Sequence, residues 1–350
     1  MVRRARRWLT ASAMGAAVLG SAGVYAQRAA TVGDARWGTI ASPVGTEIGM
    51  GEMAAAALTV GAFANYTDAQ YSSGGVGLRN LGTGTLHVSG VIKPVKAAYL
   101  YWAVITTGAA PAADKAVKLT QTFPAGHSET VAGTLLGTGA SPCWPGNTIS
   151  VFRAAVPVGD VSGNGSYEVA FTEAGASGST AGQDPWTAAT LPLLEGASLV
   201  VVGTGTGRVS IFDKGIAGKT FGNHTNPESF AYTLDLPTAT NGGQVLLDNI
   251  GADGQIGESR TAGDSKEDQP YLAAELTEIS GQIAAGPFSA TYVDFDSDWN
   301  GNAAAPLPRL WDDVGHDITA FAPSGTKSLS ISVTTQGDCL TPVANVVAVF

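Results

Sequence analysis

Hydrophobic residues in this chain occur in short runs that Gly, Pro, Asn and Asp interrupt. Apolar and polar residues alternate in 208–213 (RVSIFD) and 328–335 (SLSISVTT), which is typical of antiparallel strands with one covered face. Residues 95–105 (VKAAYLYWAVI) are almost continuously apolar, which predicts a central strand covered on both faces. Long amphipathic helical patterns are scarce. The pattern therefore predicts an all-β protein.

Further strands are expected where short apolar runs lie between turn residues. The glycines at 203–207 predict a hairpin that joins two of these strands. Residues 48–67 fit either a short helix or an extended apolar segment, and 271–279 predict a helix. The whole favours predominantly antiparallel sheets in two jelly-roll-like or immunoglobulin-like β-sandwiches packed together. The predicted strands are 75–81, 84–92, 95–105, 147–156, 165–174, 197–204, 207–215, 229–236, 243–251, 288–296, 317–321, 328–335 and 344–350.

The first 26 residues have the three parts of an export signal. Four arginines precede an uncharged apolar stretch at 9–24, and the small-residue pattern VYA precedes Gln27. A membrane anchor is the alternative, but the stretch is short and rich in Ala and Gly. We expect a cleaved signal peptide and a secreted, extracellular or cell-surface protein, with the periplasm as another destination. The remaining chain divides into an N-terminal extension at 27–45, a first sandwich at 46–190 and a second at 191–350.

The charge balance bears on the class of partner. The chain has 19 basic and 29 acidic residues, and the leader holds four of the bases and none of the acids. The processed chain therefore carries 15 basic against 29 acidic residues, a net charge of −14. This argues against nucleic acid and anionic membrane surfaces as partners, and no integral membrane protein is expected after processing. Surface glycans or other envelope proteins are the expected partners.

Two cysteines, Cys143 and Cys339, predict one disulfide in an exported protein. Loop-closure entropy gives such a long-range bond a contribution on the order of 4–5 kcal/mol to the free energy of unfolding. Two buried free thiols are the alternative.

Residues 296–301 (DSDWNG) match the first half of an EF-hand-type calcium loop. Carboxylate and amide oxygens at positions 1, 3 and 5 suit calcium, and the glycine allows the sharp turn. Position 12 is Leu307, so the bidentate glutamate is missing and a closing carboxylate must come from elsewhere. An Asp/Asn-rich turn or the outward side of a strand explains the same residues without a metal. The candidate ligands of a structural calcium ion are Asp294, Asp296, Asp298, Asn300, Asn302, Asp312 and Asp313.

Other chemistry has weaker support in the sequence. Trp299 and Trp311 lie in the acidic region, where exposed rings would stack on sugars, so they are candidate ligand-binding residues. Paired carboxylates, among them Glu173 and Glu195, would suit a glycosidase, but nothing determines their separation. The histidines have no metal-binding spacing, and the glycines at 203–207 precede a strand pattern instead of the helix that a dinucleotide site needs. No catalytic residue and no cofactor other than calcium is predicted.

The order of several stretches resembles a known group. "GGVGLRNLGTGTLHVSG", "VKAAYLYWAVITTG", "PCWPGNTISVFRAAV" and "GDCLTPVANVVAVF" resemble exported bacterial surface proteins of uncharacterised function, which are adhesin-associated β-sandwich modules. The resemblance implies a secreted or surface β-sandwich and carries over no catalytic residue. We therefore expect a non-enzymatic exported protein with a structural or adhesive role, stabilised by one calcium ion. A lectin-like carbohydrate-binding protein or a glycoside hydrolase is the alternative.

Overall fold

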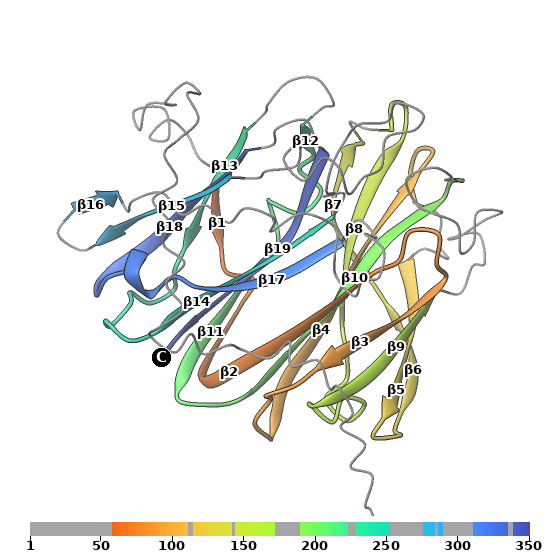
Figure 1. Ribbon diagram of the computed structural model, residues 1–350, viewed down its shortest axis with the longest axis horizontal. Coiled ribbons are helices and arrows are strands. Elements are labelled where there is room, and N and C mark those ends of the chain that lie inside the picture. The colour runs from red at the N-terminus through yellow and green to blue at the C-terminus, as the bar shows by residue number, and fades with distance from the viewer. Residues whose placement is uncertain are drawn as a thin grey trace, which may run out of the picture.

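The computed structural model describes residues 58–110, 115–141, 144–171, 190–222, 229–252, 276–283, 286–289, 311–334 and 339–350. Within these ranges every regular element is a strand except the 3-10 helix η5 (Thr319–Phe321). The predicted all-β class with antiparallel sheets packed as sandwiches is thus confirmed (Figure 1). No helix in the described part of the chain is long and apolar enough to cross a membrane.

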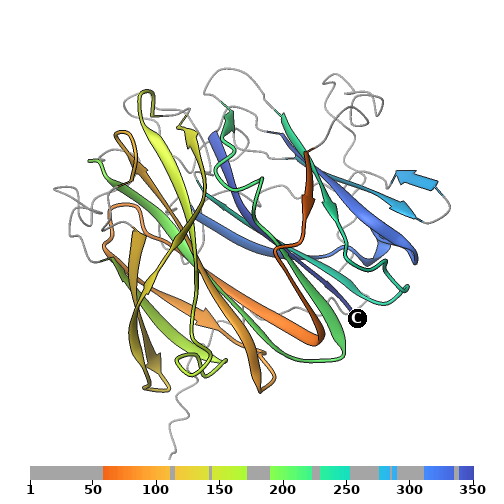
Figure 2. The same cartoon turned by 180° about the vertical axis from the view of Figure 1, so that it is seen from behind.

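The strands form three sheets, and every pairing among them is antiparallel except the parallel pair β1–β13. Figures 1 and 2 show the four-stranded sheet at one end of the molecule, the five-stranded sheet at the other, and the long sheet between them. The long, ten-stranded sheet has the order β17 (Trp311–Asp317), β14 (Val245–Ala252), β19 (Cys339–Val349), β11 (Gly207–Phe212), β2 (Ala64–Gly77), β10 (Leu193–Thr204), β4 (Val95–Thr106), β8 (Thr148–Ala155) and β7 (Thr134–Ala140), with β12 (Phe221–Gly222) paired to β19. The four-stranded sheet is β3 (Thr83–Val88), β9 (Gly165–Phe171), β5 (Ala116–Phe123) and β6 (Ser128–Ala132). The five-stranded sheet is β1 (Leu58–Gly61), β13 (Ser229–Asp235), β18 (Thr326–Thr334), β15 (Leu276–Ile283) and β16 (Gly286–Ser289).

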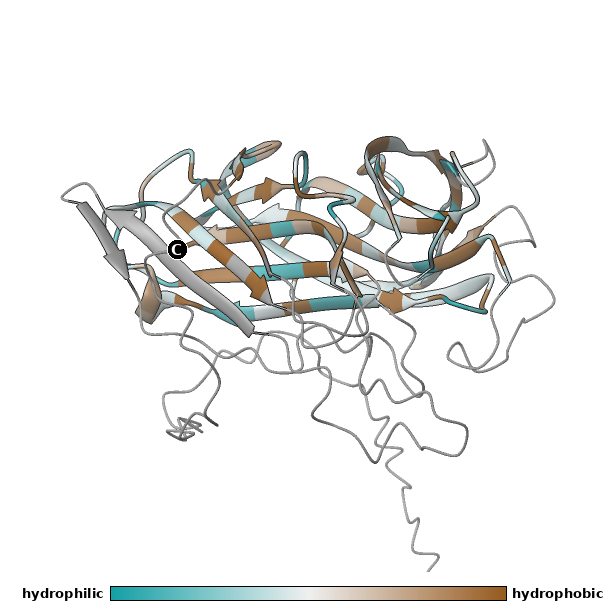
Figure 3. Cartoon of the chain, turned by 90° about the horizontal axis from the view of Figure 1, so that it is seen from above, coloured by the Kyte–Doolittle hydropathy of each residue, from teal (hydrophilic) through white to brown (hydrophobic). Residues whose placement is uncertain are grey.

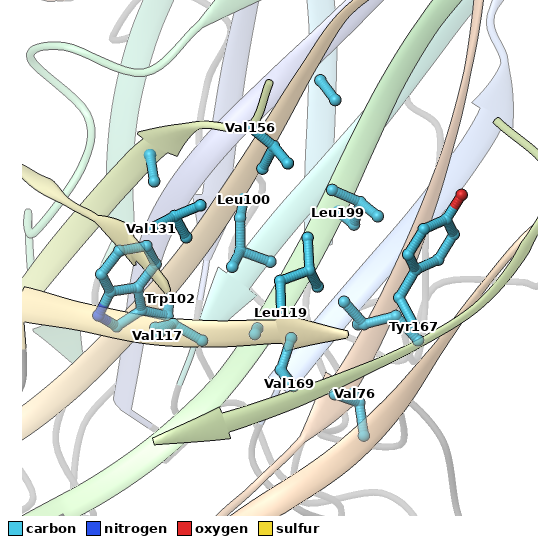
Figure 4. Close-up of a cluster of buried hydrophobic side chains, with 14 of the residues drawn as sticks. Val76, Leu100, Trp102, Val117, Leu119, Val131, Val156, Tyr167, Val169 and Leu199 are labelled. Carbon is cyan, nitrogen blue, oxygen red and sulfur yellow. The ribbon is translucent and has the colours of Figure 1, made fainter. Parts of the chain in front are cut away.

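Figure 3 shows hydrophobic and hydrophilic residues interspersed along the strands. Alternate residues of the long sheet enter three buried cores. The first core lies against the four-stranded sheet, where Leu100, Trp102 and Leu199 of the long sheet meet Leu119 and Val169 (Figure 4). The second core packs the other half of the long sheet against the five-stranded sheet. The third core takes the intervening residues of the long sheet, including those next to Leu100 and Trp102 on β4. The second core includes Phe212, Leu247, Val347, Tyr232 and Ile331, and the third includes Tyr101, Ile105, Val200, Ile211 and Val346.

Strand β2 belongs to both halves of the long sheet. Its residues 69–77 pair with β10, and its residues 64–69 pair with β11 on the other edge. The chain changes edge at Gly205, whose N–H donates to the carbonyl of Asp68 (2.9 Å). A Cβ at Gly205 would lie 2.7 Å from the carbonyl carbon of Ala69, so only glycine fits this crossing. The predicted hairpin at 203–207 is therefore wrong, because β2 lies between the two strands that it was expected to join.

The two sandwiches also share this sheet across the predicted domain boundary. Position 190 falls just before β10, which lies in the middle of the long sheet. The first core extends to Val201, beyond the boundary, and the second core contains Val60 of β1, which precedes the boundary. Strands on either side of the boundary between 46–190 and 191–350 are hydrogen-bonded to one another in the long sheet, and the division into two units stays a prediction.

Several local predictions also change. Residues 317–321 were predicted as a strand, but β17 ends at Asp317 and η5 follows. The predicted helix at 271–279 is wrong over 276–279, where β15 pairs with β18 and tertiary pairing overrides helix propensity. Within 48–67, the extended alternative is confirmed for 58–61 and 64–67. Strands β5, β6, β7, β12 and β17 were not predicted.

Candidate functional site

Two adjacent glycines let other strands approach both faces of β2. A Cβ at Gly74 would lie 2.2 Å from the carbonyl oxygen of His87 on β3. A Cβ at Gly75 would lie 2.7 Å from the Cβ of Asp313 on β17. Strand β17, hydrogen-bonded to β14 at one end of the long sheet, therefore also packs across β2 (Figure 1). This contact brings Asp313 close to residues from the middle of the sheet.

Under β17, Asp313 meets Asp248 of β14. The pKa of Asp313 is raised by burial, and hydrogen bonds with Ser198, Ser73 and Asp248 oppose the rise. Ser73 also donates to Oδ2 of Asp248 (2.5 Å). Burial and then the charges of Asp248 and Asp313 raise the pKa of the nearby Tyr71 well above its usual value. The buried Asp248 and the half-buried Asp313 thus bring two carboxyl groups together between β14 and β17, where desolvation favours the protonated form of Asp313.

Trp311 is fully buried beside this pair, so the expectation that its ring is exposed is wrong. Its Nε1 donates to Oγ of Ser198 (2.9 Å). The ring occupies the space that the missing side chain of Gly196 leaves, since a Cβ there would lie 2.4 Å from the Trp311 Cγ. Asp312 is buried as well, with only 1% of its surface exposed. Of the predicted metal ligands, Asp312 and Asp313 thus lie in a packed strand.

The other predicted site residues lie outside the described residues, so the calcium loop stays a prediction. Cys339 is buried at the start of β19 and is not free, but Cys143 lies outside the described residues and the predicted disulfide also stays a prediction. In the described part, no group of three or more His, Cys, Asp or Glu side chains could hold a metal. The residues outside are Asp294, Asp296, Asp298, Trp299, Asn300, Asn302, Cys143 and Glu173.

Glu195 forms a buried ion pair with Arg79. Arg79 Nη2 lies 2.6 Å from both carboxylate oxygens, and Glu195 is fully buried. The guanidinium also lies 5.4 Å from the ring centroid of Trp144. This candidate carboxylate is therefore engaged in holding the end of β2 to the bulge of β10 and is not accessible to a substrate.

A second buried ion pair lies at the margin of the third core. Arg153 of β8 pairs with Oδ2 of Asp213, the residue that follows β11. Tyr101 of β4 donates to the same oxygen (2.9 Å). Asp213 and Tyr101 are fully buried, and the side chain of Arg153 is 12% exposed. Three other strands separate β11 from β8 in the sheet, but the segment after β11 reaches β7, since a Cβ at Gly137 would lie 2.0 Å from the carbonyl oxygen of Ala217.

Aromatic side chains surround the partly exposed side of Arg153. Its Cζ lies 3.2 Å from the ring centroid of Phe63 and 6.0 Å from that of Tyr99. Phe63 and Tyr99 meet edge to face, with centroids 5.4 Å apart. The hydroxyls of Tyr66 and Tyr99 are 2.5 Å apart. Phe63 is 39% exposed, so this group, called the Arg153 cluster below, reaches the surface.

The Arg153 cluster was not predicted from the sequence. Phe63 lies in a stretch that fitted either a helix or an extended segment, and no motif connects it with Arg153 or Asp213. The one available signal was the aromatic pair Tyr99 and Tyr101 in the most strongly predicted strand. Chemically, the cluster offers an apolar ring, phenol hydroxyls and a guanidinium at one surface.

Comparison with known proteins adds little to this geometry. No protein-family model matches the chain, and no curated protein matches it. Among solved structures, the CUB1-EGF-CUB2 domain of human MASP-1/3 aligns over 78% of this chain and 99% of that chain, with 9% identity. The TM-score of this alignment is 0.17, so it supports no conclusion about fold or function.

Proposed function

We propose that this chain is an exported, non-enzymatic protein of the cell surface or extracellular space with a structural or adhesive role. The observation that carries the proposal is the use of buried charged groups as ties between strands. Arg79–Glu195, Arg153–Asp213 and Asp248–Asp313 each join residues at least 60 positions apart in the sequence. A glycoside hydrolase instead needs two accessible carboxylates beside a bound sugar. Glu195, one of the candidates for that role, is buried.

The proposal includes export through the N-terminal segment and one calcium ion at 294–302. The leader has the charge and residue pattern of a signal peptide, and the loop offers the carboxylate and amide oxygens that calcium prefers. In this proposal, the ion orders the acidic loop just before β17.

Export is tested by expressing the full chain with a C-terminal tag and fractionating the cells. We expect a processed form outside the cytoplasm whose N-terminal residue is Gln27, and we expect protease added to intact cells to degrade the surface-bound fraction. A variant with Arg3, Arg4, Arg6 and Arg7 replaced by Gln serves as the control and is expected to remain unprocessed. A wild-type chain that stays full-length in the cytoplasm contradicts the proposal.

A second candidate function is carbohydrate binding, and the Arg153 cluster favours it. Aromatic rings with fixed polar groups beside them are suited to sugars, which have apolar faces and hydroxyl edges. Phe63, Tyr66 and Tyr99 provide the rings, and Arg153 and the phenol hydroxyls provide the polar groups. A glycan array with the processed chain tests this, and selective binding would replace the purely structural role.

A further inference from the structure

We propose that the Arg153 cluster binds a saccharide that carries a carboxylate, with Phe63 contacting the sugar ring and Arg153 binding the carboxylate. This inference rests on the second candidate function, carbohydrate binding, and names its ligand class. It follows from three features of the cluster: a held guanidinium, a local positive charge and partly exposed aromatic surface.

The guanidinium of Arg153 is held in place before any ligand arrives. Asp213 pairs with it on its buried side, Tyr101 contacts it, and the ring of Phe63 stacks on it. A guanidinium has five N–H donors in a planar fork that matches the two oxygens of a carboxylate. Its contacts with Asp213 and Tyr101 leave other donors for a ligand, and its side chain reaches the surface. Little side-chain entropy is lost on binding, because the side chain is already ordered.

The charge of the cluster also favours an anion. Asp213 is fully buried, so its charge is directed to Arg153 and not to solvent. Lys214, the next residue, is exposed. Arg153, Asp213 and Lys214 together carry a net charge of +1, whereas the processed chain carries −14. An anionic ligand is repelled by most of this protein, and this location offers a local attraction.

The aromatic residues provide the surface for the sugar ring. Among the described residues, Phe63 is one of six large hydrophobic side chains with more than a third of their surface exposed. Tyr66 and Tyr99 lie at the margin of the third core, and their paired hydroxyls can donate to and accept from sugar hydroxyls. Burial, and then the hydrogen bond with Tyr99, raises the pKa of Tyr66, so this hydroxyl remains neutral at physiological pH.

Isothermal titration with two matched glycosides tests the proposal. Methyl glucuronide and methyl glucoside differ only in the carboxylate at C6. We expect the processed chain to bind the glucuronide about tenfold more tightly, the gain of one good charged contact. Phe63→Ala should weaken binding of both glycosides by several-fold to about tenfold. Phe123→Ala, the same change at a ring that is 71% exposed on the four-stranded sheet, should leave binding unchanged.

Arg153→Lys separates recognition of the carboxylate from simple charge. The lysine keeps the positive charge opposite Asp213 but loses the planar fork, so the preference for the glucuronide should fall toward onefold while the chain stays folded by thermal unfolding. Equal binding of the two glycosides by the wild type overturns the proposed ligand class and leaves carbohydrate binding standing. Binding of neither glycoside overturns both, and so does binding that Phe63→Ala leaves unchanged.

Discussion

Asp248 of β14 and Asp313 of β17 are diagonal neighbours on one face of two paired strands, although 65 positions separate them in the sequence. Gly75 of β2 lets β17 pack beside it, because any side chain there would overlap Asp313. The pair lies between the neighbouring strands β14 and β17, and Ser73 of β2, the strand that both sandwiches share, donates to Asp248. We therefore expect the free energy of unfolding to depend on pH through Asp313, and to change when Asp313 is made neutral or a methyl group is added at Gly75.

Asp313→Asn should make stability less dependent on pH. Burial raises the folded-state pKa of Asp313. The stabilisation that comes from protonated Asp313 is therefore fully present below the unfolded-state pKa of about 3.9. That stability is lost as pH rises through the raised pKa. In chelator, wild type should therefore lose stability relative to Asp313→Asn between acidic and mildly alkaline pH. Urea unfolding midpoints at several pH values measure this, and parallel curves for the two proteins would contradict it.

Gly75→Ala should destabilise the fold by about 1–3 kcal/mol, because the new methyl overlaps Asp313 and forces β17 away. Gly61→Ala is the matched control, since nothing lies within 4 Å of a Cβ at that position. The control should stay within about 1 kcal/mol of wild type. Chemical denaturation of the two variants checks the difference, and equal stabilities would mean that the contact between β2 and β17 contributes little.

The ion pair of Arg79 and Glu195 should be costly to break from one side only. Glu195→Leu removes the carboxylate that pairs with the buried Arg79 guanidinium and should cost about 3–5 kcal/mol. The double variant Arg79→Met with Glu195→Leu removes both charges and should recover most of that loss. A double-mutant cycle from urea unfolding measures the coupling. Additive losses would show that the two groups contribute independently.

Calcium should raise the thermal unfolding midpoint of residues 27–350 if the acidic loop binds it. At 100 times the dissociation constant, one site contributes about 2.7 kcal/mol to the free energy of unfolding. The rise should disappear in Asp296→Ala and in excess chelator, with tryptophan emission as the probe because Trp299 lies in that loop. Asp235→Ala, a change at the end of β13, is the control variant and should keep the response. Identical wild-type curves with calcium and chelator would leave the loop as a polar turn.

Much of the fold class could be predicted because strand patterns are local. The run at 95–105 corresponds to β4 (Val95–Thr106), and its alternate residues do enter two different cores, as Trp102 and Tyr101 show. The candidate site was far less predictable. Trp311 lies in an acidic, polar stretch that suggests exposure, but its ring is buried against Gly196, which has no side chain to exclude it. Arg153 and Asp213 are 60 residues apart with no shared motif.

The sequence by itself determined that the chain forms antiparallel strands, because a period of two apolar positions depends only on neighbouring residues. It also determined where glycine relieves crowding, although not which backbone approaches. The tertiary structure decided that β2 lies between β10 and β11 and that β17 packs against Gly75 of β2. It also decided which charged residues meet at the surface beside Phe63. These contacts depend on the pairing order and curvature of the long sheet. Both arise from packing among strands distant in the chain, so no periodic pattern in the sequence predicts them.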